Sequence, residues 1–217
     1  MKTSKKISLV ALVAATFFTS HVSAVEKGDW IIRAGYTNIN PISDNGDTVT
    51  VNDGSNFTAA FSYLLTNNIG VEILAGLPFE HDIYDKALGT GLKIGSTQHL
   101  PPTVTLQYYL NPTSNFRPYF GLGYNYTFFF KEKTKGPLQG ASLDIGSSTG
   151  LVYQLGFDWR LNENFILNLD LRKFNLESTA NVTNIANSSL VNDLPSSLEF
   201  NVPIDPVTLG VGLSFEF

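Results

Sequence analysis

The chain has 217 residues, and its 14 lysine and arginine residues are outnumbered by 19 aspartate and glutamate residues, for a formal net charge of −5. This acidic balance argues against a nucleic-acid binder, which would present a basic patch. The chain has no cysteine, so an exported domain of this size must be held by its core or by a membrane. No phosphate-binding loop, Cys/His cluster or calcium-loop spacing is present, and we therefore expect neither a cofactor nor a metal.

The amino-terminal residues have the layout of a secretory signal peptide. Three lysines precede the apolar stretch Ile7–Phe18, and the small-residue site Val22-Ser23-Ala24 follows. The apolar stretch is shorter than the roughly 20 residues that a membrane-spanning helix needs. We predict a signal peptide at 1–24 and a single domain at 25–217. Because the leader contains three lysines and no acidic residue, the domain keeps 11 basic and 19 acidic residues, a formal charge of −8.

Eight segments of this domain alternate apolar and polar residues with the period of a β-strand. Each has about the 9–11 residues that a tilted membrane-spanning strand requires. In chain order they are Asp29–Asn40, Asn56–Leu65, Ile69–Phe79, Pro102–Leu110, Pro118–Phe130, Gly150–Leu161, Phe165–Leu176 and Pro206–Phe217. No segment shows the i, i+3, i+4 spacing of a long amphipathic helix.

The connections between these segments alternate strictly between short and long. The short ones are 66–68, 111–115 and 162–164, and the long polar ones are 41–55, 80–101, 131–149 and 177–205. Bacterial outer-membrane barrels have short periplasmic turns and longer external loops. The pattern predicts an all-β fold, an eight-stranded antiparallel transmembrane β-barrel with both ends of the domain on the periplasmic side. For the loop 177–205, the sequence leaves open whether it is mobile or carries a small helix.

The chemistry of the two strand faces decides between this barrel and a soluble one. A soluble eight-stranded barrel such as a lipocalin points its apolar residues inward. Here one face is nearly free of charge and rich in Leu, Phe, Tyr and Trp, whereas the other carries charges that would be costly to bury without full pairing. We therefore expect a charged lumen floor made by Arg33, Glu72, Asp158, Arg160, Asp170, Arg172 and Glu216. We also predict an ion pair between Arg33 and Glu216, because the first and last strands must meet to close the barrel.

Above this floor the inward residues are apolar. They are Leu74, Pro78, Phe129, Val152, Phe174 and Leu176, with Gly76, Gly150 and Gly210 nearby. An eight-stranded barrel leaves room for side chains or for one small ligand, not for a wide channel. Plain packing and ligand binding are both open interpretations of this apolar cup.

Three stretches resemble the OmpW family of outer-membrane proteins: N-N-I-G-V-E-I-L-A-G-L-P-F at Asn67–Phe79, H-L-P-P-T-V-T-L-Q-Y-Y at His99–Tyr109, and F-R-P-Y-F-G-L-G-Y-N-Y-T-F-F at Phe116–Phe129. The resemblance runs from about Asp29 to Phe217 and implies an eight-stranded barrel in the Gram-negative outer membrane. It also implies a narrow, apolar-lined lumen proposed to pass or bind small hydrophobic molecules. External receptors or ligands of family members are not carried over, because the long loops match less well.

We expect a small apolar solute to enter the cup from outside and to leave sideways into the membrane, since the charged floor opposes its straight passage. A structural or adhesion barrel without transport is the alternative. A lipid A-modifying enzyme is less favoured: His81, His99 and Ser96 are its only recognisable candidates and no nucleophile motif surrounds any serine, so we predict no enzyme and no catalytic residue.

The expected partners follow from the barrel. They are outer-membrane lipid, a small hydrophobic solute, and the barrel-assembly machinery, which would recognise the terminal aromatic Phe217. Outward Trp30, Tyr63, Tyr108 and Trp159 lie near periplasmic strand ends, where an interfacial aromatic girdle belongs. We expect a monomer.

Overall fold

The computed structural model describes residues 26–41, 45–189 and 195–217, so the predicted signal peptide at 1–24 lies outside the described residues. The wall of the molecule is formed by β1 (Trp30–Pro41), β3 (Gly54–Leu64), β4 (Ile69–Gly76), β7 (Thr103–Tyr109), β8 (Phe116–Thr134), β10 (Ser148–Arg160), β11 (Phe165–Phe174) and β14 (Pro206–Glu216). The remaining elements are β2 (Val49–Val51), β5 (Phe79–Asp85), β6 (Lys93–Leu100), β9 (Ser142–Ile145), β12 (Glu177–Thr183), β13 (Ser197–Pro203) and two short 3-10 helices, Gly136–Leu138 and Ile185–Asn187.

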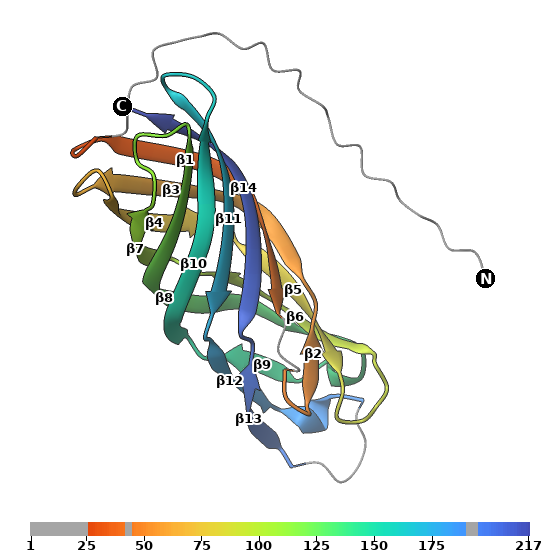
Figure 1. Cartoon of the computed structure of the whole chain (residues 1–217). Coiled ribbons are helices and arrows are strands. Elements are labelled where there is room, and N and C mark those ends of the chain that lie inside the picture. The colour runs from red at the N-terminus through yellow and green to blue at the C-terminus, as the bar shows by residue number, and fades with distance from the viewer. Residues whose placement is uncertain (1–25, 42–44, 190–194) are drawn as a thin grey trace, which may run out of the picture.

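The eight wall strands close into an antiparallel barrel (Figure 1). They follow the order β10-β11-β14-β1-β3-β4-β7-β8, and the pairing of β8 with β10 completes the ring. The last strand pairs with the first from Ile31–Glu216 to Pro41–Pro206, so neither strand has a free edge. The predicted fold class is confirmed. No helix in the described ranges is long and apolar enough to cross a membrane.

Alternation along each wall strand explains why these residues build a barrel. On β10, Leu151, Tyr153 and Leu155 are exposed, whereas Val152 and Gln154 between them are buried. Apolar residues therefore cover the outside of the wall and polar residues fill much of the inside. An exposed apolar band of this extent suits lipid rather than water.

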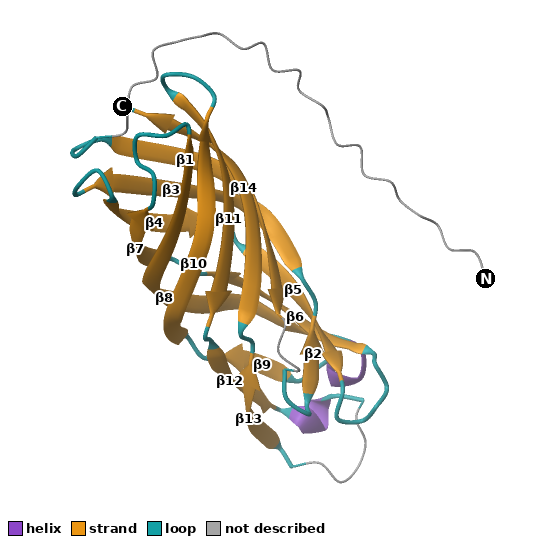
Figure 2. Ribbon diagram, viewed as in Figure 1, coloured by secondary structure: helices purple, strands orange, loops and turns teal. Residues whose placement is uncertain are grey.

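The long connections carry additional strands that the sequence pattern did not separate from loops. β5 and β6 pair from Phe79–His99 to Tyr84–Lys93 and prolong the wall, while β13, β12 and β9 form a separate sheet at the same end of the barrel (Figures 1 and 2). The carboxy terminus and the short turns lie at the opposite end (Figure 1). Apolar residues of the separate sheet, such as Ala180 and Val202, pack against Val49 and Ile83. This burial of apolar side chains gives the long connections a defined structure.

The outward faces of β5 and β6 mark where the lipid-facing band ends. Glu80 and Gln98 are hydrogen-bonded to each other on that face, and Asp82 forms an ion pair with Lys93. Carboxylates and an ammonium group are disfavoured against hydrocarbon. We therefore place β5, β6 and the separate sheet outside the membrane.

On the β4–β7 side, the wall is interrupted on the way from the membrane to this external part. The β4–β7 ladder ends at Leu74–Thr103, and the β5–β6 ladder begins at Phe79–His99. Between them lie Ala75–Pro78 on one side and Leu100–Pro102 on the other. Three of these residues are prolines, which have no backbone N–H to donate to a ladder. We call this interruption the wall break.

Candidate functional site

A charged floor crosses the lumen in the membrane-spanning part of the barrel. It consists of Arg33, Arg117, Arg160, Arg172, Glu72, Asp158, Asp170 and Glu216, all of them buried. Four arginines face four carboxylates, so the set is neutral as a whole. All seven charged residues predicted for the floor lie within it.

Ion pairs join most of these side chains into one network. Arg33 contacts Glu72 at 2.5 Å and Asp158 at 3.3 Å. Arg172 contacts the other Glu72 oxygen at 2.7 Å and Asp170 at 2.6 Å. Uncharged groups complete the network, because Gln154 donates to Glu72 at 3.2 Å and to Asp170 at 2.5 Å. Buried charges arranged in this way satisfy one another and fill the space, as a narrow barrel requires.

The predicted ion pair between Arg33 and Glu216 is wrong. The register of β1 and β14 places Ser214 opposite Arg33 and Ile31 opposite Glu216. Arg33 therefore donates to the hydroxyl of Ser214 at 3.1 Å, and Glu216 pairs with Arg160 at 2.5 Å. Closure of the barrel does bring the two strands together, but it does not bring these two charges into contact.

Arg117 is the floor residue that sequence reasoning missed. It is nearly fully buried, contacts Asp158 at 3.3 Å and lies over the Tyr109 ring, 5.6 Å from its centroid. Two signals were present in the sequence. The alternation of β8 extends back through Tyr119 to Arg117, and the seven predicted floor residues carry three positive charges against four negative ones.

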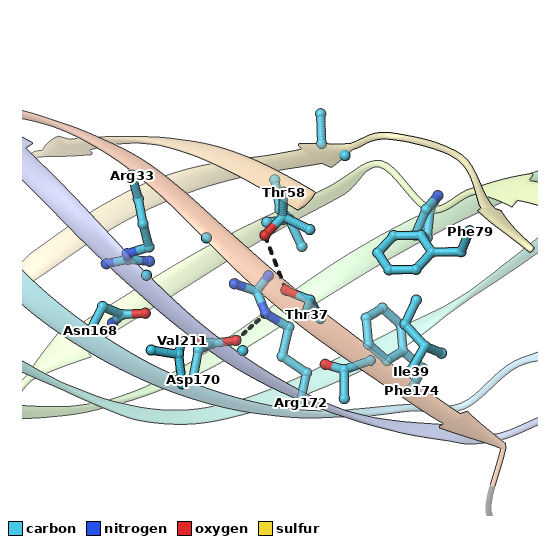
Figure 3. A pocket seen from close by; sticks show the side chains of 18 residues that line it. Arg33, Thr37, Ile39, Thr58, Phe79, Asn168, Asp170, Arg172, Phe174 and Val211 are labelled. Carbon is cyan, nitrogen blue, oxygen red and sulfur yellow. Dashed lines mark hydrogen bonds and ion pairs between the residues drawn. The ribbon is translucent and has the colours of Figure 1, made fainter. Parts of the chain in front are cut away.

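Directly above the floor lies a pocket with about 540 Å³ of atom-free space, part of it open to solvent, which we call the lower pocket (Figure 3). One end is polar and is made by Arg33, Asn168, Asp170 and Arg172. The other end is apolar and is made by Ile39, Phe79 and Phe174. A hydrogen bond of 3.0 Å between the Thr37 and Thr58 hydroxyls lies along the wall between the two ends (Figure 3).

The lower pocket reaches the wall break. Leu74, Ala75 and Gly76 line it from β4, and Pro101 lines it from the facing segment. Leu74 is half-buried and points inward at the last rung of the β4–β7 ladder. The pocket therefore has a polar base, an apolar top and a side where the backbone ladder is interrupted.

A second pocket, which we call the vestibule, lies in the external part and has about 660 Å³ of atom-free space, part of it open to solvent. Its lining is almost wholly apolar and comes from the upper wall and from the separate sheet, including Val49, Leu143, Ala180 and Val202. Ile39 lines both pockets, so the vestibule and the lower pocket adjoin each other.

The six residues predicted for the apolar cup are divided between these spaces. Leu74 and Phe174 line the lower pocket, whereas Phe129 and Leu176 line the vestibule. Val152 is fully buried and packs with Phe174 and Leu176. Pro78 stands in the wall break, where its carbonyl accepts a hydrogen bond of 2.8 Å from the Asn56 side chain. Contact of any of the six with a ligand stays a prediction.

Two histidines face each other in the vestibule. The ring centroids of His81 and His99 lie 4.9 Å apart and the rings are almost perpendicular. Burial lowers the pKa of His99 to about 3, with a further lowering by the neighbouring His81, and burial also lowers the pKa of His81. Both rings are therefore neutral at ordinary pH.

The histidines do not combine with Ser96 into a nucleophile and its base. In the β5–β6 ladder His81 pairs with Thr97, whereas Ser96 pairs with Asp82. Because side chains alternate between faces, Ser96 and His81 point to opposite sides of the hairpin. The three candidates for catalysis are thus not assembled.

Comparison with known proteins places the chain in one family. The model of the OmpW family matches residues 26–217. Outer membrane protein W of Vibrio cholerae is 39% identical, over 77% of this chain and 83% of that protein. The crystal structure of the outer membrane protein OprG from Pseudomonas aeruginosa superposes with a TM-score of 0.81 at 30% identity, covering 90% of this chain and 99% of that one. A more distant relative, the dibenzothiophene metabolism operon protein PahQ of Pseudomonas aeruginosa, is 23% identical over 96% of this chain and 98% of that protein.

These matches confirm the resemblance on which the sequence prediction rested and the predicted location in a Gram-negative outer membrane. The chain belongs to the OmpW family, and it is an outer-membrane β-barrel.

Proposed function

We propose that the barrel takes up small apolar molecules from outside the cell and releases them sideways into the outer membrane. The route begins in the vestibule, passes Ile39 into the lower pocket and leaves through the wall break beside Leu74 and Pro101. One observation carries the proposal: the apolar vestibule adjoins the apolar top of the lower pocket, above a charged floor and beside an interrupted stretch of wall.

The charged floor supports a sideways exit rather than a straight one. An apolar molecule moving straight down would have to part Glu72 from Arg33 and Arg172. Separating a buried ion pair leaves uncompensated charge and costs about 3–5 kcal/mol. An exit beside the floor leaves these pairs intact and puts the solute in contact with hydrocarbon.

The wall break supports the position of the exit. The pairs β1–β14, β10–β11 and β11–β14 are joined by continuous ladders, and a solute can separate these strands only by breaking backbone hydrogen bonds. At the break, Pro78, Pro101 and Pro102 cannot donate such bonds. The name of the relative PahQ, which belongs to a dibenzothiophene metabolism operon, agrees with an apolar solute class for this family.

Leu74 is the residue that tests this route. The uptake of an apolar fluorescent probe such as N-phenyl-1-naphthylamine is measured in cells that express the variant in place of the wild-type barrel. We expect Leu74→Arg to abolish most of this uptake, because the new charge would stand in the lower pocket beside the exit. The matched control is Leu88→Arg, the same substitution at an exposed position in the β5–β6 connection, outside both pockets.

Folding of each variant is checked by its heat-dependent mobility in detergent gels. Unchanged uptake by a folded Leu74→Arg barrel would contradict the proposed route. Equal uptake by cells with and without the wild-type barrel would instead favour the alternative, a structural or adhesion barrel without transport.

A further inference from the structure

The vestibule contains polar atoms that its own lining leaves without partners. Within the described residues, His81 Nε2 and both ring nitrogens of His99 are buried and make no hydrogen bond. His81 is 4% exposed and His99 is 6% exposed, and both rings line the vestibule. Most buried polar groups in folded proteins are hydrogen-bonded, so three such atoms in one pocket need an explanation.

The other polar side chains of the vestibule are already partnered. Thr97 donates its hydroxyl to the Gln98 carbonyl at 3.3 Å, and Ser178 donates to the Gly146 carbonyl at 2.5 Å. The unpartnered guanidinium nitrogens of Arg117 and Arg172 in the charged floor belong to groups that already form ion pairs. Among the described residues that line this pocket, the histidine pair therefore supplies the side-chain nitrogens that have no hydrogen-bond partner.

The hydrogen-bonding roles of the two rings can be assigned. His81 Nδ1 lies 2.6 Å from the Asn52 carbonyl, which can only accept, so Nδ1 carries the proton and Nε2 is left as an acceptor. His99 is neutral, so it offers one N–H donor and one acceptor. The pair together therefore has both donor and acceptor capacity.

The surroundings of the pair select for an uncharged ligand. His99 stacks on Phe129 with centroids 5.6 Å apart and meets the edge of Phe79 at 5.7 Å. The remaining lining is largely aliphatic. A charged ligand would lose its hydration here against aromatic and aliphatic groups, which is far more costly than burial of a neutral hydroxyl.

We infer that the vestibule selects small apolar molecules that carry one hydroxyl group, such as medium-chain alcohols and phenols, over hydrocarbons of equal size, with His81 and His99 as the selecting residues. A hydroxyl donates to His81 Nε2 and accepts from the N–H of His99. A ketone of the same size can only accept and satisfies one of the two rings, and a hydrocarbon satisfies neither. The inference rests on the proposed function and narrows its solute class.

The test uses the full barrel in lipid nanodiscs and measures displacement of bound N-phenyl-1-naphthylamine by octane, 2-octanone and 1-octanol. The three ligands differ in their partition into lipid, so their affinities cannot be compared directly. The affinity ratio of 1-octanol to octane is therefore measured for the wild type and for His99→Phe, and the first ratio is divided by the second. Phenylalanine keeps the ring and its stacking while removing the nitrogens. We expect this quotient to be about ten, the value of one buried hydrogen bond. The same quotient for 2-octanone over octane should be about as large, because the one hydrogen bond of the ketone is accepted from His99.

His81→Phe provides a second variant should His99→Phe fail to fold, and it is expected to lower the same ratio. The control is Gln98→Ala, next to His99 but on the outward face of β6, which is expected to leave the ratio unchanged. A quotient near one in folded His99→Phe and His81→Phe barrels that still bind the probe would overturn the inference and leave the proposed function standing. Absence of probe binding to the wild type would overturn both.

Discussion

The strongest energetic prediction concerns Glu72, which stands at the centre of the charged floor. Its side chain is fully buried and accepts from Arg33 at 2.5 Å, from Arg172 at 2.7 Å and from Gln154 at 3.2 Å. Glu72→Gln keeps the shape but removes the charge, so the neutral floor gains one net positive charge and two guanidinium groups lose a carboxylate. Each charge-assisted hydrogen bond contributes about 1.5–3 kcal/mol.

In the Glu72→Gln variant the new amide oxygen still accepts one bond, whereas the new NH₂ group faces a guanidinium that can only donate. We therefore expect a loss of about 3–5 kcal/mol in the free energy of unfolding, in the range measured when one partner of a buried pair is removed. The assay is urea unfolding in lipid vesicles, followed by tryptophan fluorescence and extrapolated to zero denaturant. Glu163→Gln, an exposed carboxylate in the β10–β11 turn, is the control. A loss of less than about 1 kcal/mol for Glu72→Gln would refute the reasoning, because it would mean that the network contributes little more than exposed ion pairs do.

Two further predictions follow from the same physical terms. Arg160→Met alone should destabilise the barrel by about 3 kcal/mol, because it leaves the buried Glu216 carboxylate without its partner. The double variant Arg160→Met/Glu216→Leu should recover most of that loss, because it removes the unpaired charge as well. The urea midpoints of the two single variants and of the double variant measure these effects, and additive losses would contradict the prediction. His99 should remain neutral at pH 5, as read from the pH dependence of its ring proton shifts in NMR. Its pKa of about 3 lies below its ordinary value of 6.5, so between these two pH values the unfolded chain binds more protons than the folded barrel. The contribution of His99 to the free energy of unfolding should therefore fall by about 2 kcal/mol when the pH is lowered to 5. Titration of the ring near pH 6.5 would show that it is not buried as described.

Much of the barrel could be predicted from the sequence because a two-residue period assigns every side chain of a strand to one face. Once one face of β10 carries Leu151, Tyr153 and Leu155, the residues between them must point inward, and Asp158 and Arg160 follow at the same spacing. The alternation of short and long connections then fixes the order of the strands. Neither step needs knowledge of how the strands are offset against one another.

The contacts inside the barrel depend on that offset, and this is where sequence reasoning failed. Arg33 and Glu216 lie near the same end of two paired strands, but this nearness alone does not bring their side chains together. In the observed register the two residues stand on different rungs, and the nearest carboxylates to Arg33 come from β4 and from β10 on the far side of the lumen. Partners across a barrel are set by its width and stagger, which no single strand encodes.

The external strands were missed for a related reason. The segments around β5 and β12 are short and polar on their outward face, so they resemble loops when read alone. They become strands because β12 and β13 bury Ala180 and Val202 against Val49 and Ile83, a contact between parts of the chain that are far apart in sequence. The vestibule forms between these parts. The sequence therefore indicates that the two histidines lie near one another, but it does not indicate that they line a pocket.

The charged floor and the histidine pair are two different uses of buried polarity in the same lumen. In the floor, Glu72 and Asp170 are held by arginines, and these paired side chains fill the interior. In the vestibule, His81 and His99 stand among apolar groups with ring nitrogens that the described residues leave unpaired. A paired network gains nothing from a passing solute, whereas unpaired nitrogens gain a hydrogen bond from any neutral molecule that can supply one. On the proposed route, selection is therefore expected at the external entrance, and the floor and the wall break are expected to set the direction in which a selected molecule leaves.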